Sequence, residues 1–152
     1  MASTPLISST PLISSICSIC SSDPSTHVLR KVAEKATHIT FYTHPSKVKI
    51  EYSADAIIQH YTHRLKEKGP KPWIWIFDGA QFDTDHIMDL QTGQGIADLL
   101  KDHTETLIEI KVINPTIHLK FLLKVIQPFM EDSLRAKLCI LDDRPRSVLE
   151  FL

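Results

Sequence analysis

The segment 73–141 decides the fold of this chain; it reads WIWIFDG at 73–79, IEIKVINP at 108–115, IHLKFLLKVIQPFM at 117–130 and KLCIL at 137–141. Three of these stretches are short, apolar and rich in β-branched or aromatic residues, which predicts strands at 73–77, 108–113 and 137–141. The stretch 117–130 has the length of a helix. Strands that alternate with helices pair in parallel, so we expect an α/β fold: a mixed, largely parallel sheet with helices packed on it.

The predicted helix 117–130 is too apolar for an ordinary surface helix. Its polar residues form one narrow stripe at spacings of four, three and four: Lys120, Lys124, Gln127 and Glu131. The sheet covers only one face of a helix, so the remaining apolar flank needs a second partner. Pro128 removes a backbone hydrogen bond and bends the last turn, so we expect a helix that is able to move.

The upstream sequence predicts further elements on both sides of the first strand. We expect a helix at 27–36, strands at 38–42 and 48–52, and a helix at 54–68 that Ser53 caps. A further helix is predicted at 85–102, with a break near Gly93 and Gly95 because glycine weakens a helix interior. The strand 108–113 alternates, so the face that carries Glu109 and Lys111 is expected to be polar or partly covered.

Composition divides the chain into two regions. The hexapeptide STPLIS occurs at 3–8 and again at 9–14, within a Ser/Thr-rich and nearly uncharged stretch. Residues 1–24 are therefore expected to be a low-complexity, disordered tail. Residues 25–152 are long enough to bury one core, and we expect them to form a single α/β domain.

Charge and composition exclude several classes of protein. Lys plus Arg number 17 and Asp plus Glu 18, so the chain lacks the basic excess of a dedicated nucleic-acid binder. No apolar run approaches the ~20 residues that cross a bilayer, and the N-terminus does not resemble a secretory signal. Three cysteines make no disulfide framework, so a reducing, cytoplasmic location is expected.

The side chains that often carry chemistry form no strong motif. There is no nucleophile elbow, phosphate loop or dinucleotide fingerprint, so we expect no enzyme and no cofactor. Cys17 and Cys20 have the CxxC spacing of zinc and redox sites but lack a second pair, and His60 and His63 lack a third ligand nearby in sequence. We therefore expect no metal site there.

An acidic cluster follows the strand 73–77. It comprises Asp83, Asp85, His86 and Asp89, and a hard metal ion is one interpretation of it. The alternative is a solvated loop and helix N-terminus, where carboxylates interact favourably with the helix dipole.

The order of the C-terminal pieces resembles the CRAL-TRIO lipid-binding domain, a family that includes secretory phosphatidylinositol transfer proteins. The resemblance runs through Asn114-Pro115, the apolar helix with Gln127-Pro128-Phe129-Met130, and the strand after Ala136. Phe77-Asp78-Gly79 resembles the family's Asp-x-x-Gly strand end, and 103–107 stands where the family has Tyr-Pro-Glu-Arg. The helical N-terminal lobe of transfer proteins has no counterpart, so a minimal or divergent member is implied.

The resemblance implies a lipid-sized cavity over the sheet, with the helix 117–130 as a gate. It also implies that Glu105 and Lys137 contact an inositol headgroup, for which a carboxylate and an ammonium are chemically suited; the alternative is a surface ion pair. The apolar side chains that we expect to contact the ligand are Trp75, Phe77, Phe121, Leu122, Val125 and Phe129.

Two functions remain in view. The first is binding of a phospholipid or other small hydrophobic ligand, with lipid transfer at a transient membrane surface and a peripheral location at membranes. The second is a protein-interaction or scaffolding module of the same fold, in which a protein partner or a homodimer covers the apolar helix. A third interpretation takes that helix as ordinary core.

Overall fold

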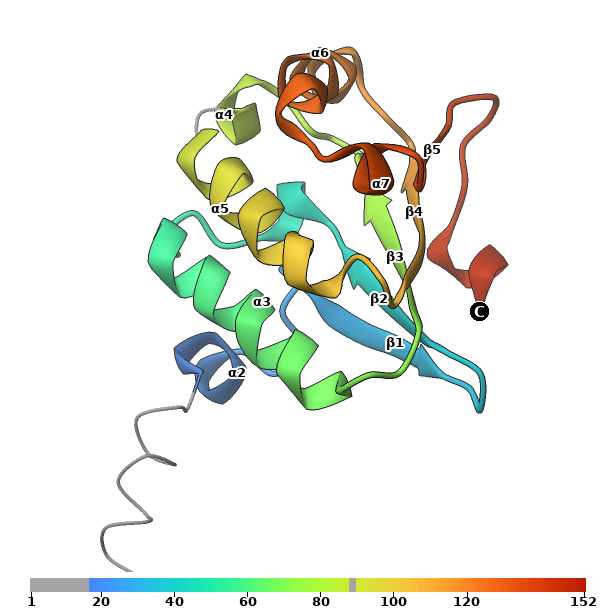
Figure 1. The fold of residues 1–152 in the computed structure, drawn as a ribbon. Helices are drawn as coiled ribbons and strands as arrows, with labels where there is room; N and C mark the ends of the chain where they lie inside the picture. The colour runs from blue at the N-terminus through green and yellow to red at the C-terminus, as the bar shows by residue number, and fades with distance from the viewer. Residues whose placement is uncertain (1–16, 88–89) are drawn as a thin grey trace, which may run out of the picture.

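The computed structural model describes residues 17–87 and 90–152, and one five-stranded sheet organises them (Figure 1). The strands, in chain order, are β1 (Arg30–Glu34), β2 (Ile39–Thr43), β3 (Trp73–Asp78), β4 (Leu107–Ile113) and β5 (Leu138–Leu141). Their order in the sheet is the same as in the chain. β1 pairs antiparallel with β2, and all other neighbours are parallel, so the predicted α/β class is confirmed.

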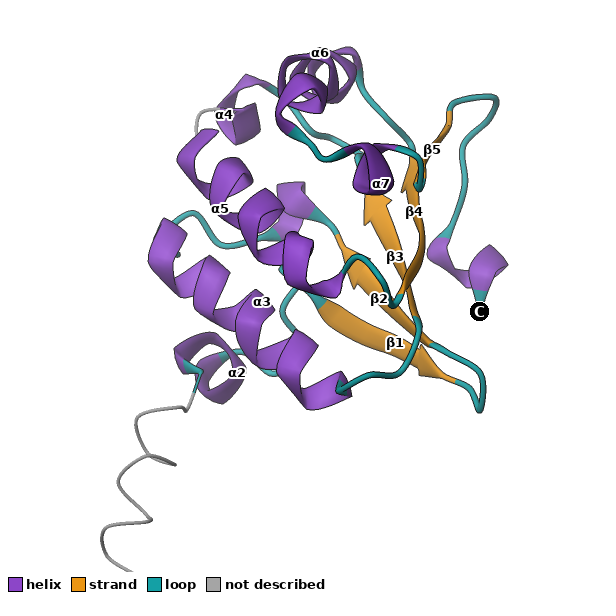
Figure 2. Ribbon diagram, in the orientation of Figure 1, coloured by secondary structure: helices purple, strands orange, loops and turns teal. Residues whose placement is uncertain are grey.

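The helices lie on one face of this sheet (Figure 2). They are α2 (Ser18–Ser22), α3 (Ala54–Lys68), α4 (Thr84–Ile87), α5 (Leu90–Leu100), α6 (Ile117–Ile126) and α7 (Asp132–Arg135). Short 3₁₀ turns lie in the connecting segments: η1 (Pro45–Lys47), η2 (Lys101–His103) and η3 (Gln127–Phe129), whereas η4 (Val148–Phe151) packs on the opposite face of the sheet. Each parallel crossover moves to the next strand, and crossovers share one hand, so α3, α5 and α6 must all fall on the same side.

The strand β3 is covered on both faces, as its continuous apolar sequence predicts. Trp73, Trp75 and Phe77 pack in the large core beneath the helices. Ile76 alternates with them and points to the other face, where it packs with Tyr42, Ile113 and the η4 residues. The C-terminal segment thus covers the face of the sheet that the helices leave open (Figure 1).

Local signals fix the ends of the longer helices. The Ser53 side chain accepts a hydrogen bond from the Ala56 amide at the start of α3, as predicted. Gly69, with φ of 62°, ends this helix in a conformation that side chains rarely adopt. Thr116 caps α6 in the same way, through the Leu119 amide. No helix in the described ranges has both the length and the apolar character to cross a bilayer.

Two upstream predictions are wrong. The segment 27–36 contains the strand β1 instead of a helix, because its backbone pairs with β2 from Arg30 to Glu34. Val28 and Leu29, just before the strand, are buried. The segment 48–52 is not a strand but a series of turns after η1; Val48 and Tyr52 pack against the core while Ile50 is 93% exposed. Tertiary contacts override local propensity in both places.

Two predicted boundaries also change. The helix α5 continues through Gly93 and Gly95 without a break. The folded part begins before the expected Ser25, since α2 is formed and Cys17 and Ile19 are 1% exposed. The expectation of disorder for 1–16 lies outside the described residues.

Candidate functional site

A cavity of about 290 Å³ lies between the sheet and helices α3, α5 and α6. Trp75, Phe77, Ile110 and Val112 contribute to it from the two central strands. Leu138 of β5 also lines the cavity, and the helices and loops supply mostly apolar side chains, among them Ile57, Tyr61, Phe82, Ile96, Leu119, Leu122, Leu123, Ile126 and Met130. The inward face of α6 therefore borders an apolar space between the helices and the sheet.

The polar groups near the sheet side of this cavity already have partners within the protein. The Thr43 hydroxyl donates to the Val28 carbonyl at 2.8 Å and accepts from the Trp75 indole N–H at 2.8 Å. The Tyr61 hydroxyl lies 3.4 Å from the same Thr43 oxygen. Burial raises the pKa of Tyr61, so the phenol stays neutral. A guest in this part of the cavity meets hydrocarbon rather than open donors or acceptors, which favours an apolar ligand.

The helix α6 forms one wall of the cavity and shows a second apolar face to solvent. Leu119 and Leu123 are buried, and they line the cavity together with Leu122 and Ile126. The opposite flank consists of Ile117 (78% exposed), Phe121 (62%), Val125 (37%) and, in η3, Phe129 (70%). We call these four residues the α6 flank. The spacing of four places them in one row along the helix.

The predicted apolar contacts divide into two groups. Trp75, Phe77 and Leu122 line the cavity, as expected. Phe121, Val125 and Phe129 do not line it, because they belong to the α6 flank. The sequence identified this helix as doubly apolar, but it could not determine which of its two apolar faces points inward.

The turn that follows α6 is anchored by a side chain. The α-helix ends at Ile126, and Pro128 lies in η3, so the proline ends the regular helix as its geometry requires. The Arg135 guanidinium donates to the carbonyls of Gln127 at 2.9 Å and Met130 at 3.1 Å. These bonds tie η3 to α7.

Glu105 and Lys137 lie at the amino ends of the neighbouring parallel strands β4 and β5. The Lys137 ammonium donates to the Thr104 carbonyl, and Glu105 is exposed. No ion pair joins these two side chains in the part of the chain that the structure describes, and neither lines the cavity. The structure therefore brings Glu105 and Lys137 to the same end of the strands, outside the apolar cavity.

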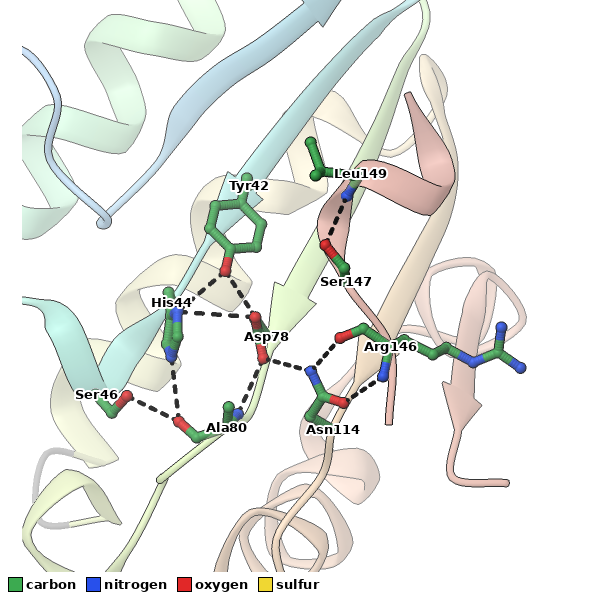
Figure 3. Close-up of polar contacts among 9 residues, drawn as sticks. All are labelled: Tyr42, His44, Ser46, Asp78, Ala80, Asn114, Arg146, Ser147 and Leu149. Carbon is green, nitrogen blue, oxygen red and sulfur yellow. Dashed lines mark hydrogen bonds and ion pairs between the residues drawn. The ribbon is translucent and has the colours of Figure 1, made fainter. Parts of the chain in front are cut away.

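A buried polar network, which the sequence did not predict, occupies the carboxyl ends of β2, β3 and β4 (Figure 3). The Asp78 carboxylate at its centre accepts from the Tyr42 hydroxyl at 2.6 Å, the Ala80 amide at 3.0 Å and the Asn114 amide group at 3.0 Å. Asn114 also exchanges two hydrogen bonds of 2.8 Å with the Arg146 backbone. The network therefore fastens the C-terminal segment to the strand ends.

The same network contains a histidine whose two ring nitrogens both contact protein groups. His44 places Nδ1 3.0 Å from the Tyr42 hydroxyl and Nε2 3.2 Å from the Ala80 carbonyl, so both ring nitrogens have partners. Burial, together with the Asp78 carboxylate, raises the pKa of Tyr42. Tyr42, His44 and Asp78 are each 6% exposed, so the network is an interior feature.

The acidic cluster forms the start of a helix. The Asp83 carboxylate accepts from the Asp85 amide at 3.0 Å, and the Asp83 amide donates to His86 Nδ1 at 3.0 Å. Asp83 and Asp85 are exposed. Asp89 lies outside the described residues. These contacts correspond to the interpretation as a capped helix N-terminus.

Neither protein-family models nor curated proteins give a match to this chain.

Proposed function

We propose that this protein binds a phospholipid or other small hydrophobic ligand in the cavity beneath α6. The observation that carries the proposal is the apolar cavity of about 290 Å³ next to a helix that is apolar on its outer flank as well. The resemblance of 103–141 to the CRAL-TRIO domain supports the same function. Burial of a hydrocarbon chain there contributes about 0.8 kcal/mol per methylene.

The volume of the cavity restricts what the closed protein holds. Ligand pockets span about 300–1,000 Å³, so this cavity is at the small end of that range. One hydrocarbon chain suits it better than a two-chain lipid. A complete phospholipid requires α6 to move outward, which fits the role of a gate.

The α6 flank supports exchange of the ligand at a membrane surface. Lys124 is exposed on the same helix, and the Lys120 ammonium pairs with Asp142 beside it. Apolar side chains bordered by lysines are typical of helices that bind in the lipid interface, and each lysine near an anionic surface contributes about 1 kcal/mol. Opening of α6 would then occur where its apolar flank is covered by lipid.

Glu105 and Lys137 remain the proposed headgroup contacts on the strength of the family resemblance. Exchange of the ammonium for a carboxylate in Lys137→Glu should weaken binding to phosphoinositide-containing vesicles. Lys35→Glu, an exposed position just after β1, is the matched control for charge. Equal binding of both variants and the unchanged protein would remove Lys137 from the site.

Native mass spectrometry of the full chain, purified from the cells that express it, tests the proposal directly. We expect an additional mass of several hundred daltons that organic extraction removes. Bare protein as the only species would overturn the proposal.

The exposed α6 flank also favours a second candidate, a protein-interaction module in which a partner covers it. A homodimer of bare chains in the same spectrum would support that function instead of ligand binding.

A further inference from the structure

Three side chains capable of binding a metal meet at the contact between α2 and α3. They are Cys17, which precedes α2, Cys20, which lies within it, and His60, in the middle of α3. Their Sγ and ring nitrogen atoms all lie within 4.8 Å of one another. Cys17 and His60 are buried, at 1% and 0% exposure, so the cluster is an interior feature and not a chance surface contact.

The hydrogen bonds of His60 orient one ring nitrogen toward both sulfurs. Its Nε2 lies 2.9 Å from the Leu29 carbonyl oxygen, which can only accept, so Nε2 carries the proton. The lone pair is therefore on Nδ1, which lies 3.4 Å from Cys17 Sγ and 3.3 Å from Cys20 Sγ. A backbone carbonyl that fixes the tautomer of a histidine in this way is the usual support of a metal ligand.

The single lone pair on His60 Nδ1 cannot satisfy the S–H groups of both Cys17 and Cys20. Nδ1 can accept one S–H proton well, but both sulfurs converge on it. A cation between the three atoms would use all of them, because each thiolate and the imidazole offers one electron pair.

We propose that Cys17, Cys20 and His60 bind a zinc ion, with a fourth position open to water. Zn–S bonds of about 2.3 Å and a Zn–N bond of about 2.05 Å at the tetrahedral angle separate S from N by about 3.6 Å. The observed separations of 3.4 and 3.3 Å are within about 0.3 Å of that value. Small side-chain shifts therefore suffice to admit the ion. Thiolate and imidazole ligands select zinc over magnesium or calcium.

The binding step is balanced in charge and in protons. The two S–H protons leave to solvent as the thiolates bind, and two thiolates neutralise the charge of Zn²⁺. Arg64 follows His60 by one helical turn. The Arg64 Nε is buried and lacks a hydrogen-bond partner within the described part of the chain, so a donor is available beside the cluster.

A redox disulfide is the competing interpretation of the CxxC spacing, and the surroundings disfavour it. A disulfide removes both S–H donors and leaves the Nδ1 lone pair of His60 without a partner, although Nδ1 faces the two sulfurs at 3.4 and 3.3 Å. A metal ion uses all three groups.

The ion would fasten the N-terminal segment to the helix that forms one wall of the ligand cavity. Cys17 and His60 are 43 residues apart in the chain. A link across such a separation reduces the conformational freedom of the unfolded chain and so stabilises the fold. Ile57 and Tyr61, on either side of His60 in α3, line the cavity. A bound zinc ion would therefore also restrict the movement of α3, which forms one wall of the cavity.

Titration of the reduced full-length chain with Co²⁺ tests the site, since cobalt replaces zinc and absorbs light when thiolates bind it. We expect thiolate-to-cobalt charge-transfer absorption and tetrahedral d–d bands at one equivalent, both lost when one equivalent of Zn²⁺ is added. Native mass spectrometry should show one zinc per chain, and the zinc-bound protein should melt at a higher temperature than the metal-free protein.

Two single variants and a control locate the ligands. Cys17→Ser and Cys20→Ser should each weaken the charge-transfer band, because one of the two thiolates is lost, and should weaken zinc binding by at least about 10–100-fold, the cost of losing even an outer partner of a metal ligand. Cys139→Ser removes the third cysteine, which lies in β5 away from the cluster, and should bind as the unchanged chain does. Circular dichroism shows whether each variant is folded, and His60→Asn adds a test of the nitrogen ligand if it folds.

Several results would overturn the proposal. Absence of cobalt absorption and of bound zinc in the reduced chain excludes the site. The same holds if Cys17→Ser and Cys20→Ser keep full affinity while folded. The third result concerns metal-free protein isolated from cells and alkylated before reduction. If only one of its three thiols reacts, Cys17 and Cys20 form a disulfide instead of a metal site.

Discussion

Replacement of Gly93 by leucine tests the ligand cavity through its volume. Gly93 lies in α5 and lines the cavity, and a Cβ atom built there meets no heavy atom within 4 Å. A larger side chain at this position can therefore enter the space without overlap at its first atom. Gly95 is different, because a Cβ there would overlap the Ile58 side chain.

The expected magnitudes follow from helix propensity and from apolar burial. Gly93→Ala should stabilise α5 by about 0.5–1 kcal/mol, because alanine favours the helix over glycine. For a chain of this size that raises Tm by about 2–4 °C per kcal/mol. Gly93→Leu adds a side chain of about four carbons, which displaces a similar amount of ligand hydrocarbon. At about 0.8 kcal/mol per methylene, ligand binding weakens by roughly 3 kcal/mol, or more than 100-fold.

The assay compares Gly93→Ala with Gly93→Leu. Both remove glycine from the helix, and only leucine fills the cavity, so the comparison separates the loss of cavity volume from the gain in helix propensity. Native mass spectrometry should find bound ligand in Gly93→Ala and bare protein in Gly93→Leu. Both variants should melt at or above the Tm of the unchanged chain, measured at the same metal and ligand content. Ala97→Leu, on the same wall, repeats the filling of the cavity from a second position. Full ligand occupancy in folded Gly93→Leu and Ala97→Leu would refute the assignment of this cavity as the binding site.

Two further predictions concern the surface and the response to pH. Phe121→Ser combined with Phe129→Ser should reduce co-sedimentation with anionic vesicles several-fold, whereas Ile50→Ser, a still more exposed apolar position outside the α6 flank, should not. Equal loss in both would contradict a specific role for the flank. Burial, with the charge of Arg30 or Lys68 nearby, lowers the pKa of His27 and His103 below 6.5, so the unfolded chain binds more protons and the free energy of unfolding should fall as pH drops below about 6.5. Urea unfolding between pH 7 and 5 measures how steeply the free energy of unfolding falls with pH. The double variant His27→Gln, His103→Gln should reduce this pH dependence; an unchanged pH dependence would show that other groups cause it.

The sequence by itself determined the central layers of the fold. Strands β3, β4 and β5 and helices α3 and α6 lie within one or two residues of their predicted starts, because each combines a continuous or periodic apolar run with a clear boundary. The Asn114-Pro115 break and Gly69 are such boundaries. The excess apolar surface of the 117–130 segment was also visible in sequence, and it correctly indicated that α6 has two apolar faces.

Only the tertiary structure decided which groups meet across long separations. The strand β1 has no strong local signal, and its pairing with β2 converts a segment of helical appearance into an edge strand. Asp78 and Asn114 join because parallel strands bring their carboxyl ends to one edge. Cys20 and His60 are 40 residues apart, so no local spacing rule reveals that one nitrogen faces two sulfurs.

Helix α6 separates what the sequence determines from what the tertiary structure decides. Its sequence specifies two apolar faces, and the hydrophobic effect, which is not directional, does not choose between them. The crossover between β4 and β5 fixes the rotation of the helix, which turns Leu122 toward the cavity and leaves Phe121 in solvent. Local periodicity thus determines what each element is, whereas the path of the chain determines which of its faces becomes a site.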